Sequence, residues 1–152
     1  MKLKLLQIKE PTGKEVMKSA ELIAEMMAEE GKADRECLWV IHLNCGLKVI
    51  EKELAHMGTL TEAAVSCREI FRKAVINSTA FIVTVHNHPS GNSEPSFEDK
   101  TLWDRLAKAG DILGITITDN LIITPNGSYY SQCNDTREQE LSPLANVKEA
   151  KK

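Results

Sequence analysis

Residues 80–99 have the sequence AFIVTVHNHPSGNSEPSFED, which contains three structural signals in succession. The run from Ala80 to Val85 is short and almost continuously apolar, a pattern typical of a strand buried on both faces. Proline, glycine, asparagine and serine then dominate from His88 to Pro95 and predict a loop. The pattern from Phe97 to about Ala109 predicts a helix. This segment therefore predicts a buried strand, a loop and a helix in that order.

Three side chains of this segment form a candidate metal site. His86 and His88 are two residues apart at the end of an extended run, so both imidazoles can point to the same side. Asp99 falls in the first turn of the following helix, and its carboxylate can face the imidazoles if that helix packs beside the strand end. Two histidine nitrogens and one carboxylate oxygen suit zinc, and three protein ligands leave a fourth position for water. Zinc lowers the pKa of that water to about 7, which supplies hydroxide at neutral pH.

The same residues also have structural explanations. Histidines are common at strand ends, and Ser96 followed by Asp99 fits a capping box at a helix start. Taken singly, Ser96 and Asp99 are more often helix caps than functional groups. The combination of two histidines, a Gly/Pro loop and an acid in a capped first turn favours the metal site. Asp99 can serve both purposes because both favour its ionised form.

Strand and helix patterns extend on both sides of this segment. Before it we expect a strand at Leu3–Ile8 and a helix at about Gly13–Glu30, which a capping box at Thr12 and Glu15 would start. A hairpin of strands at Cys37–Leu43 and Leu47–Leu54 should follow. The next element is a helix at about Ser66–Asn77, with a capping box at Ser66 and Glu69. After it we expect strands at Ile115–Ile117, Leu121–Thr124 and Ser128–Ser131. Together they predict an α/β (α+β) fold with a mixed sheet flanked by helices. We expect one domain over residues 1–133, with its core at about 35–131, and a polar, disordered tail over 134–152.

The overall composition is that of a globular protein, with 42% hydrophobic and 27% charged residues among 152. The net charge of -3 does not favour a nucleic-acid partner, because such proteins usually carry a basic face. No signal-peptide pattern or bilayer-length apolar run is present, so we expect a cytoplasmic protein without membrane association. The four cysteines, which form no C-x-x-C pair, are expected to be reduced thiols; they are Cys37, Cys45, Cys67 and Cys133.

The spacing H-x-H, seven residues, Ser, two residues, Asp resembles the motif of the JAMM (MPN) metalloproteases. The fuller pattern HNHPSG…PS..D resembles the RadC-like branch of that family. Shorter matches occur in the same order along the chain, and they are Glu36 at a strand start, Gly58-Thr59-Leu60, Arg68-Glu69-Ile70-Phe71, and Ala109-Gly110 through Leu113-Gly114-Ile115. The resemblance covers about Arg35 to Ser131.

The resemblance implies both a fold and a set of roles. The fold would be a curved mixed sheet with helices on its faces, the JAMM/MPN (cytidine-deaminase-like) architecture, with Zn²⁺ at the sheet's edge. His86, His88 and Asp99 would be the zinc ligands. Ser96 would hydrogen-bond the developing oxyanion. An upstream glutamate would take a proton from a zinc-bound water and deliver it to the leaving amine.

Glu36 is our candidate for this base, because it begins a strand upstream of the motif, where the resemblance places the acid. A solvated glutamate at a strand start is the structural alternative. Glu51, Glu53 and Glu69 are competitors, and Glu69 also fits the third position of a capped helix. The isolated histidines, His42 and His56, are expected to be structural or surface residues.

The chain departs from the family pattern in three ways. Long RadC proteins carry a helix-hairpin-helix-like N-terminal region, for which this chain is too short. Asp119-Asn120 stands where the family usually has Asp-His, so any role of that histidine is in doubt here. Cys67 stands where a proline often precedes the Arg-Glu pair.

The leading hypothesis is zinc-dependent hydrolysis of a peptide or isopeptide bond in a peptide or protein substrate. The first alternative is a non-catalytic MPN-type binding module that has kept the motif. The second is a role in DNA repair, the label that the RadC family carries. A zinc nucleoside deaminase is not favoured, because the H-x-E…P-C-x-x-C signature is missing. The substrate and the oligomeric state are left open.

Overall fold

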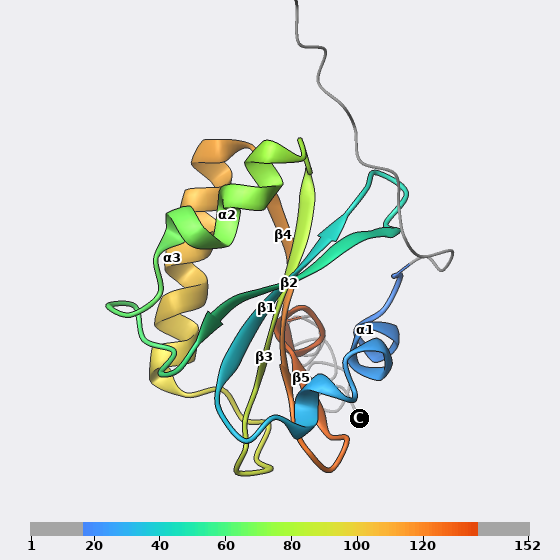
Figure 1. Ribbon diagram of the computed structural model, residues 1–152, viewed down its shortest axis with the longest axis vertical. Coiled ribbons are helices and arrows are strands. Elements are labelled where there is room, and N and C mark those ends of the chain that lie inside the picture. The colour runs from blue at the N-terminus through green and yellow to red at the C-terminus, as the bar shows by residue number, and fades with distance from the viewer. Residues whose placement is uncertain (1–16, 137–152) are drawn as a thin grey trace, which may run out of the picture.

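The computed structural model describes residues 17–136, which form a five-stranded mixed sheet flanked by helices (Figure 1). In chain order the elements are α1 (Ala20–Met26), the 3-10 turn η1 (Glu30–Lys32), β1 (Cys37–Leu43), β2 (Val49–Met57), α2 (Cys67–Ile76), β3 (Phe81–Asn87), α3 (Phe97–Leu113), β4 (Thr116–Ile123) and β5 (Tyr129–Ser131). The predicted α/β (α+β) class, with a mixed sheet flanked by helices, is confirmed.

The sheet has the strand order β2-β1-β3-β4-β5. β3 and β4 are parallel, and all other neighbours are antiparallel. Every residue of β1 is buried, as is every residue of β3 after Phe81, so the apolar run before His86 is the buried strand that it predicts. The parallel pair needs a crossover connection, which α3 supplies. The end of β3 and the start of α3 are therefore joined by one short loop.

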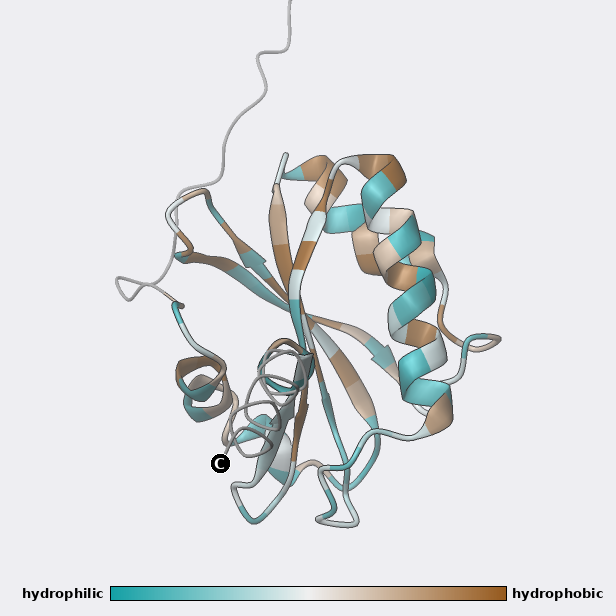
Figure 2. Cartoon of the chain, turned by 180° about the vertical axis from the view of Figure 1, so that it is seen from behind, coloured by the Kyte–Doolittle hydropathy of each residue, from teal (hydrophilic) through white to brown (hydrophobic). Residues whose placement is uncertain are grey.

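Helices cover both faces of the sheet, with α1 on one side and α2 and α3 on the other (Figure 1). Bands of hydrophobic and hydrophilic residues alternate along α3, as expected for a helix with one buried side (Figure 2). The core on the α1 side includes Ile23, Met27, Trp39, Ile41, Val85 and Leu121. The core on the α2 and α3 side includes Leu38, Val40, Ile70, Phe71, Ile82, Leu102 and Leu106. The sheet thus separates two apolar layers, and β3 contributes to both.

α3 begins at the capping box that the sequence predicts. The Ser96 hydroxyl oxygen accepts the Asp99 backbone N–H at 3.0 Å, and the Asp99 carboxylate accepts the Ser96 N–H at 2.9 Å. The helix continues to Leu113, four residues beyond the predicted end at Ala109, and stops where Gly114 adopts a left-handed φ of 71°. Glycine has no side-chain penalty in that conformation, so it terminates the helix.

The predicted helix at Gly13–Glu30 was wrong in its boundaries. Residues 17–19 are not helical, and α1 spans only Ala20–Met26. The hydroxyl oxygen of Ser19 accepts the Leu22 N–H and so starts the helix later than the apolar spacing suggests. The predicted strand at Leu3–Ile8 and the capping box at Thr12 and Glu15 lie outside the described residues.

Two further predictions needed correction. The separate strands expected at Ile115–Ile117 and Leu121–Thr124 are one strand, β4, whose polar centre is paired inside the sheet. The pairing with β3 is irregular where Thr118 is skipped, and this bulge accounts for the break in the apolar pattern. α2 follows Ser66 as expected, but the Ser66 side chain makes no capping hydrogen bond.

The chain does not become irregular at once after Asn134. Residues 132–136 form a helical turn, while residues 137–152 of the predicted tail lie outside the described residues. Within residues 17–136, no helix combines the length and the hydropathy that a membrane span requires.

Candidate metal centre

His86 and His88 lie at the end of β3 with both ring Nε2 atoms directed to one point. The two Nε2 atoms are 3.1 Å apart, which agrees with the same-side arrangement expected for residues i and i+2 of a strand. The His88 Nδ1 atom lies 2.8 Å from the Asn92 carbonyl oxygen and donates to it, so the Nε2 atom is the ring nitrogen that could bind a metal ion. The His88 backbone N–H also donates to the Ile123 carbonyl, which anchors the loop to β4.

Asp99 completes the cluster from the first turn of α3. Its Oδ1 atom is 3.2 Å from His86 Nε2, and its Oδ2 atom is 3.1 Å from His88 Nε2. The same Oδ2 atom accepts the Ser96 N–H, so the capping box fixes the carboxylate in this orientation. Asp99 is only 4% exposed, and a carboxylate so buried requires such partners.

The donor set and its spacing fit a metal ion. One ligand atom from each of His86, His88 and Asp99 lies within 4.8 Å of the others, and among residues 17–136 this is the one group of its kind. In a tetrahedral zinc site with bonds of about 2.1 Å, ligand atoms are about 3.4 Å apart. The separations of 3.1 to 3.2 Å are close to this value, so small side-chain shifts would suffice. The cluster can hold a metal ion.

The charges within the cluster favour an ionised Asp99. Burial acts to raise the pKa of the Asp99 carboxyl, but hydrogen bonds with His86 and His88 outweigh it and hold that pKa far below its ordinary value. The hydrogen bond to Asp99 is also the largest influence on His88, and it raises the pKa of His88 above its ordinary 6.5. In the metal-free protein the Asp99 carboxylate therefore favours the protonated form of His88.

Trp103 supports the cluster from behind. This side chain is almost fully buried on α3, one turn after Asp99. Its ring centroid is 6.0 Å from that of His86, in a tilted arrangement. Its other neighbour is Tyr130 of β5, with the two rings nearly parallel and their centroids 6.0 Å apart. His86 therefore lies beside a pair of stacked aromatic rings that the sequence analysis did not identify as part of the site.

Glu36 lies beside the cluster, immediately before β1. The β1–β3 register ends at the pair Leu38 and His86, and Glu36 lies two residues before Leu38. The hydrogen bond to Asp99 is the largest cause of the raised pKa of His88, and the negative charge of Glu36 also contributes to it. The Glu36 carbonyl accepts the Gly58 N–H at 2.9 Å.

The glutamates considered as alternatives to Glu36 lie in other environments. Glu51 accepts hydrogen bonds from Lys73 at 2.9 Å and Asn77 at 3.2 Å, which ties β2 to α2. Glu69 is exposed on α2. Both therefore have structural or surface surroundings.

The two isolated histidines are also accounted for. His42 is fully buried in β1, and its Nε2 atom lies 2.9 Å from a carboxylate oxygen of Glu53, the third competing glutamate. The Nε2 atom of His56 lies 3.2 Å from the Thr59 carbonyl oxygen. The structure therefore places His42, Glu53 and His56 in local contacts outside the metal cluster.

Asn87, between the two histidines, was not singled out from the sequence. It is fully buried, and its side chain hydrogen-bonds the backbone on both sides of Glu36, at Cys37 and Arg35. A signal was present, because an amide at the end of a buried apolar strand must have hydrogen-bond partners. The sequence could not indicate which groups those partners are.

The Asp119-Asn120 departure has a structural explanation in this chain. Asn120 is buried, accepts a hydrogen bond from Thr84 and donates one to Gln132 at 2.8 Å. The Asp119 carboxylate accepts a hydrogen bond from the Ser131 hydroxyl at 2.6 Å. These contacts join β3, β4 and the chain that follows β5.

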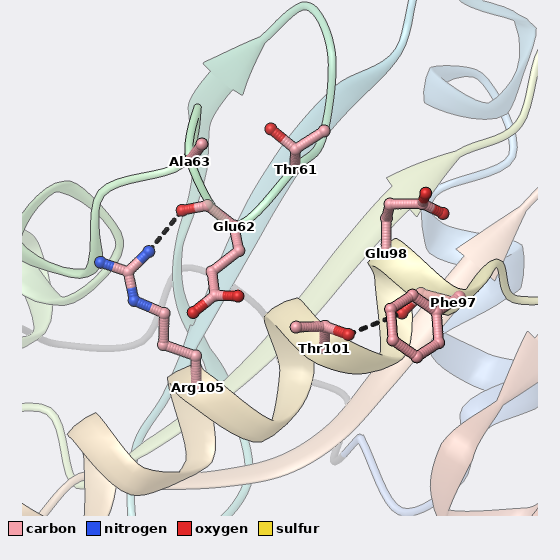
Figure 3. A pocket seen from close by; sticks show the side chains of 7 residues that line it. All are labelled: Thr61, Glu62, Ala63, Phe97, Glu98, Thr101 and Arg105. Carbon is pink, nitrogen blue, oxygen red and sulfur yellow. Dashed lines mark hydrogen bonds between the residues drawn. The ribbon is translucent and has the colours of Figure 1, made fainter.

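A pocket of about 620 Å³ lies between the loop after β2 and the start of α3 (Figure 3). Its lining residues are Thr61, Glu62, Ala63, Phe97, Glu98, Thr101 and Arg105. Figure 3 shows the loop residues on one side and the α3 side chains on the other, with Arg105 donating to the Glu62 carbonyl. The loop wall is formed by residues 61–63, and the helix wall begins at Phe97, the residue after Ser96. The pocket therefore lies beside the first turn of α3, which also carries Asp99.

Comparisons with known proteins agree with this geometry. A family model described as "RadC-like JAB domain" matches residues 16–139. The UPF0758 protein of Desulforudis audaxviator is 39% identical over 117 residues, which are 77% of this chain and 50% of that protein. The UPF0758 protein of Rubrobacter xylanophilus is 44% identical over 90 residues, 59% of this chain and 40% of that protein. The chain spans about half the length of the curated relatives that it matches.

Proposed function

This chain belongs to the RadC-like JAB domain family, and on that premise we propose that it is a zinc-dependent hydrolase of peptide or isopeptide bonds. The observation that carries the proposal is the convergence of His86, His88 and Asp99, with Glu36 beside them. Three protein ligands leave one metal position open, which is the arrangement of catalytic rather than structural zinc sites.

The residues of the cluster would hold zinc through the Nε2 atoms of His86 and His88 and a carboxylate oxygen of Asp99. When bound, zinc supplies a hydroxide at neutral pH and polarises the substrate carbonyl. The Asn92 carbonyl keeps the His88 ring in the tautomer that leaves Nε2 free to bind. The ionised state of Asp99 provides the negative charge that a cation requires.

Glu36 would act as the general base and then as the general acid. Its carboxylate takes a proton from the attacking water, whose oxygen bonds to the substrate carbonyl carbon. The bond between that carbon and the amide nitrogen then breaks, and Glu36 returns the proton to the leaving amine. Proton transfer of this kind is worth about 10²- to 10⁴-fold in rate. The contribution of the Glu36 charge to the raised pKa of His88 supports the assignment.

Ser96 would stabilise the oxyanion that develops on the carbonyl oxygen. Its oxygen already accepts the Asp99 N–H, which leaves the hydroxyl hydrogen as a donor. The pocket along α3 supports a peptide substrate, because it offers space for a side chain next to the site. Phe97, which lines this pocket and is 80% exposed, offers an apolar contact to a substrate.

Zinc content and cleavage together test the proposal. Wild-type protein, His88→Ala and Glu36→Gln are purified without chelator and assayed for zinc and for cleavage of a broad peptide and isopeptide library. We expect about one zinc per wild-type chain, since the donor set is complete. His88→Ala should lose most of the zinc, whereas Glu36→Gln should retain it and cleave at least about 10²-fold more slowly.

Glu69→Gln is the matched control, because Glu69 is an exposed glutamate on α2 and should leave zinc content and cleavage unchanged. Wild-type protein without zinc, or Glu36→Gln with full activity, would contradict the proposal. Zinc-loaded protein that leaves the whole library intact would favour the non-catalytic binding module instead. A salt-dependent shift of DNA by the same protein would support the DNA-repair role.

A further inference from the structure

We propose that Asn87 is a positioning residue that fixes the backbone on both sides of Glu36 and thereby holds the Glu36 carboxylate next to His88. The inference rests on the proposed function, in which Glu36 exchanges protons with the water and the leaving amine. Asn87 itself would touch neither the metal nor the substrate.

The Asn87 side chain bonds the two peptide groups that flank Glu36. Its Oδ1 atom accepts the Cys37 N–H at 2.7 Å, which is the amide directly after Glu36. Its Nδ2 atom donates to the Arg35 carbonyl at 2.8 Å, which is the carbonyl directly before Glu36. A further hydrogen bond at 3.2 Å reaches the Ala33 carbonyl. The amide therefore restrains the two backbone torsions of Glu36 from both sides.

These hydrogen bonds occur where the pairing between β1 and β3 has ended. β1 begins at Cys37, and residues 33–36 are outside any strand. The last backbone pair between β1 and β3 is Leu38 with His86, so the ladder stops before Glu36. The Asn87 amide offers a donor and an acceptor side by side, as the backbone of a neighbouring strand would. It thus extends the pairing to the segment that carries Glu36.

The position of Asn87 in the sequence links this segment to the ligands. His86 and His88 point to one side of β3, and Asn87, between them, points to the other. One short stretch of chain therefore carries two ligand side chains and the support for Glu36. Asn87 is fully buried, so water does not compete for its hydrogen bonds. Any displacement of the Glu36 backbone relative to β3 would have to break these bonds.

Zinc affinity and cleavage kinetics of Asn87→Ala test the catalytic consequence. The variant should bind zinc as tightly as wild type, because all three ligands remain, while kcat falls by about 10²-fold with little change in KM. The double variant Asn87→Ala/Glu36→Gln should be no slower than Glu36→Gln alone, because Asn87 acts only through Glu36. Asn120→Ala is the matched control, because it removes another buried amide, bonded to Thr84 and Gln132, and should leave kcat unchanged.

Hydrogen exchange of the Cys37 amide tests the bracing without any substrate. Cys37 N–H should be protected in wild type and in Glu36→Gln, and should exchange at least about 10-fold faster in zinc-loaded Asn87→Ala. If Asn87→Ala does not fold, Asn87→Asp replaces it. That variant keeps the acceptor for Cys37 but has no donor for Arg35, so Cys37 protection should remain while kcat falls.

The outcomes separate this inference from the proposed function. Unchanged Cys37 protection in Asn87→Ala, or loss of zinc together with activity, would overturn the positioning role. Multiplicative losses in the double variant would likewise show that Asn87 acts independently of Glu36. If wild-type protein binds zinc but cleaves nothing, the proposed hydrolase fails, and the exchange measurement still decides whether Asn87 braces the Glu36 segment.

Discussion

Asp99 shows how one side chain can cap a helix and also belong to a cluster that could hold a metal ion. Its Oδ2 atom accepts the Ser96 N–H at 2.9 Å and lies 3.1 Å from the His88 ring nitrogen, while its Oδ1 atom faces His86. Capping holds the carboxylate at the start of α3, where the imidazoles meet it. The structural and functional interpretations of Asp99 therefore describe a single geometry.

The His88–Asp99 pair predicts how the stability of the metal-free protein depends on pH. The hydrogen bond to Asp99 raises the pKa of His88 above its ordinary 6.5, while the Asp99 carboxyl stays ionised. A raised folded-state pKa stabilises the fold below the unfolded value, and this contribution is lost as pH rises through the folded value. The free energy of unfolding in chelator should therefore fall as the pH rises above the ordinary histidine pKa of about 6.5.

Urea unfolding of wild type and His88→Gln in chelator measures this effect. The variant cannot accept the proton, so its stability should change less over the same range of pH. A decrease of equal size in His88→Gln, or an increase in the wild type, would show that the pair does not have this linkage. With zinc bound the sign should reverse, because zinc requires the neutral imidazole.

At the level of elements, α3 contributes residues both to the site and to the hydrophobic core. Its first turn supplies Ser96 and Asp99, and its last turn packs against the start of β4 near Gly110. A Cβ atom at Gly110 would lie 2.5 Å from the Ile115 carbonyl oxygen and 3.5 Å from the Phe71 ring. The close approach of α3 to Ile115, the residue before β4, thus depends on the absence of a side chain at Gly110.

Gly110→Ala should therefore destabilise the protein although alanine favours helices. An exposed helical Gly→Ala change stabilises by about 1 kcal/mol, whereas overpacking of a tight contact costs about 1 to 3 kcal/mol. We expect the free energy of unfolding, measured in urea, to decrease by about 1 to 2 kcal/mol. The exposed neighbour Lys108→Ala should change it by less than about 0.5 kcal/mol. An unchanged or increased stability of Gly110→Ala would contradict the close contact.

At the level of the whole molecule, the site lies at one end of the interior strands β1 and β3, where the segment before β1 meets the chain that connects β3 to α3. The segment before β1 contributes Glu36, the end of β3 contributes the two histidines, and the start of α3 contributes Ser96 and Asp99. A metal ion held by residues of both β3 and α3 would bind the folded protein but not the unfolded chain. Metal binding should therefore stabilise the fold as a whole.

Zinc titration of global unfolding measures this coupling. Zinc at about 100 times its Kd should raise the free energy of unfolding of wild type by about 2.7 kcal/mol, and chelator should remove the gain. Asp99→Asn keeps an oxygen that can accept the Ser96 N–H but loses the ionised ligand, so it should gain much less. An equal zinc-dependent gain in Asp99→Asn would show that the ion binds elsewhere on the chain.

Much of the architecture follows from local patterns along the chain. The apolar runs of β1 and β3, the loop after His88 and the capping box of α3 depend on near neighbours, so hydrophobic period and turn chemistry suffice to predict them. The cluster of His86, His88 and Asp99 was predictable for the same reason. The two histidines are two residues apart at the end of one strand, and Asp99 lies in the capped first turn of the next helix. The break expected within β4 was wrong because the partners of its polar centre, Thr84 and Ser131, are distant in sequence.

Contacts between distant segments determine the remainder of the site. Glu36 lies two residues before the last β1–β3 pair, Leu38 with His86, and Glu51, Glu53 and Glu69 could not be distinguished from Glu36 before their neighbours were known. The partners of Asn87 are 50 to 54 residues away. Side-chain chemistry and short-range spacing state which groups can bind a metal. Which glutamate stands beside them depends on strand pairing, whose energy comes from burial across the whole sheet.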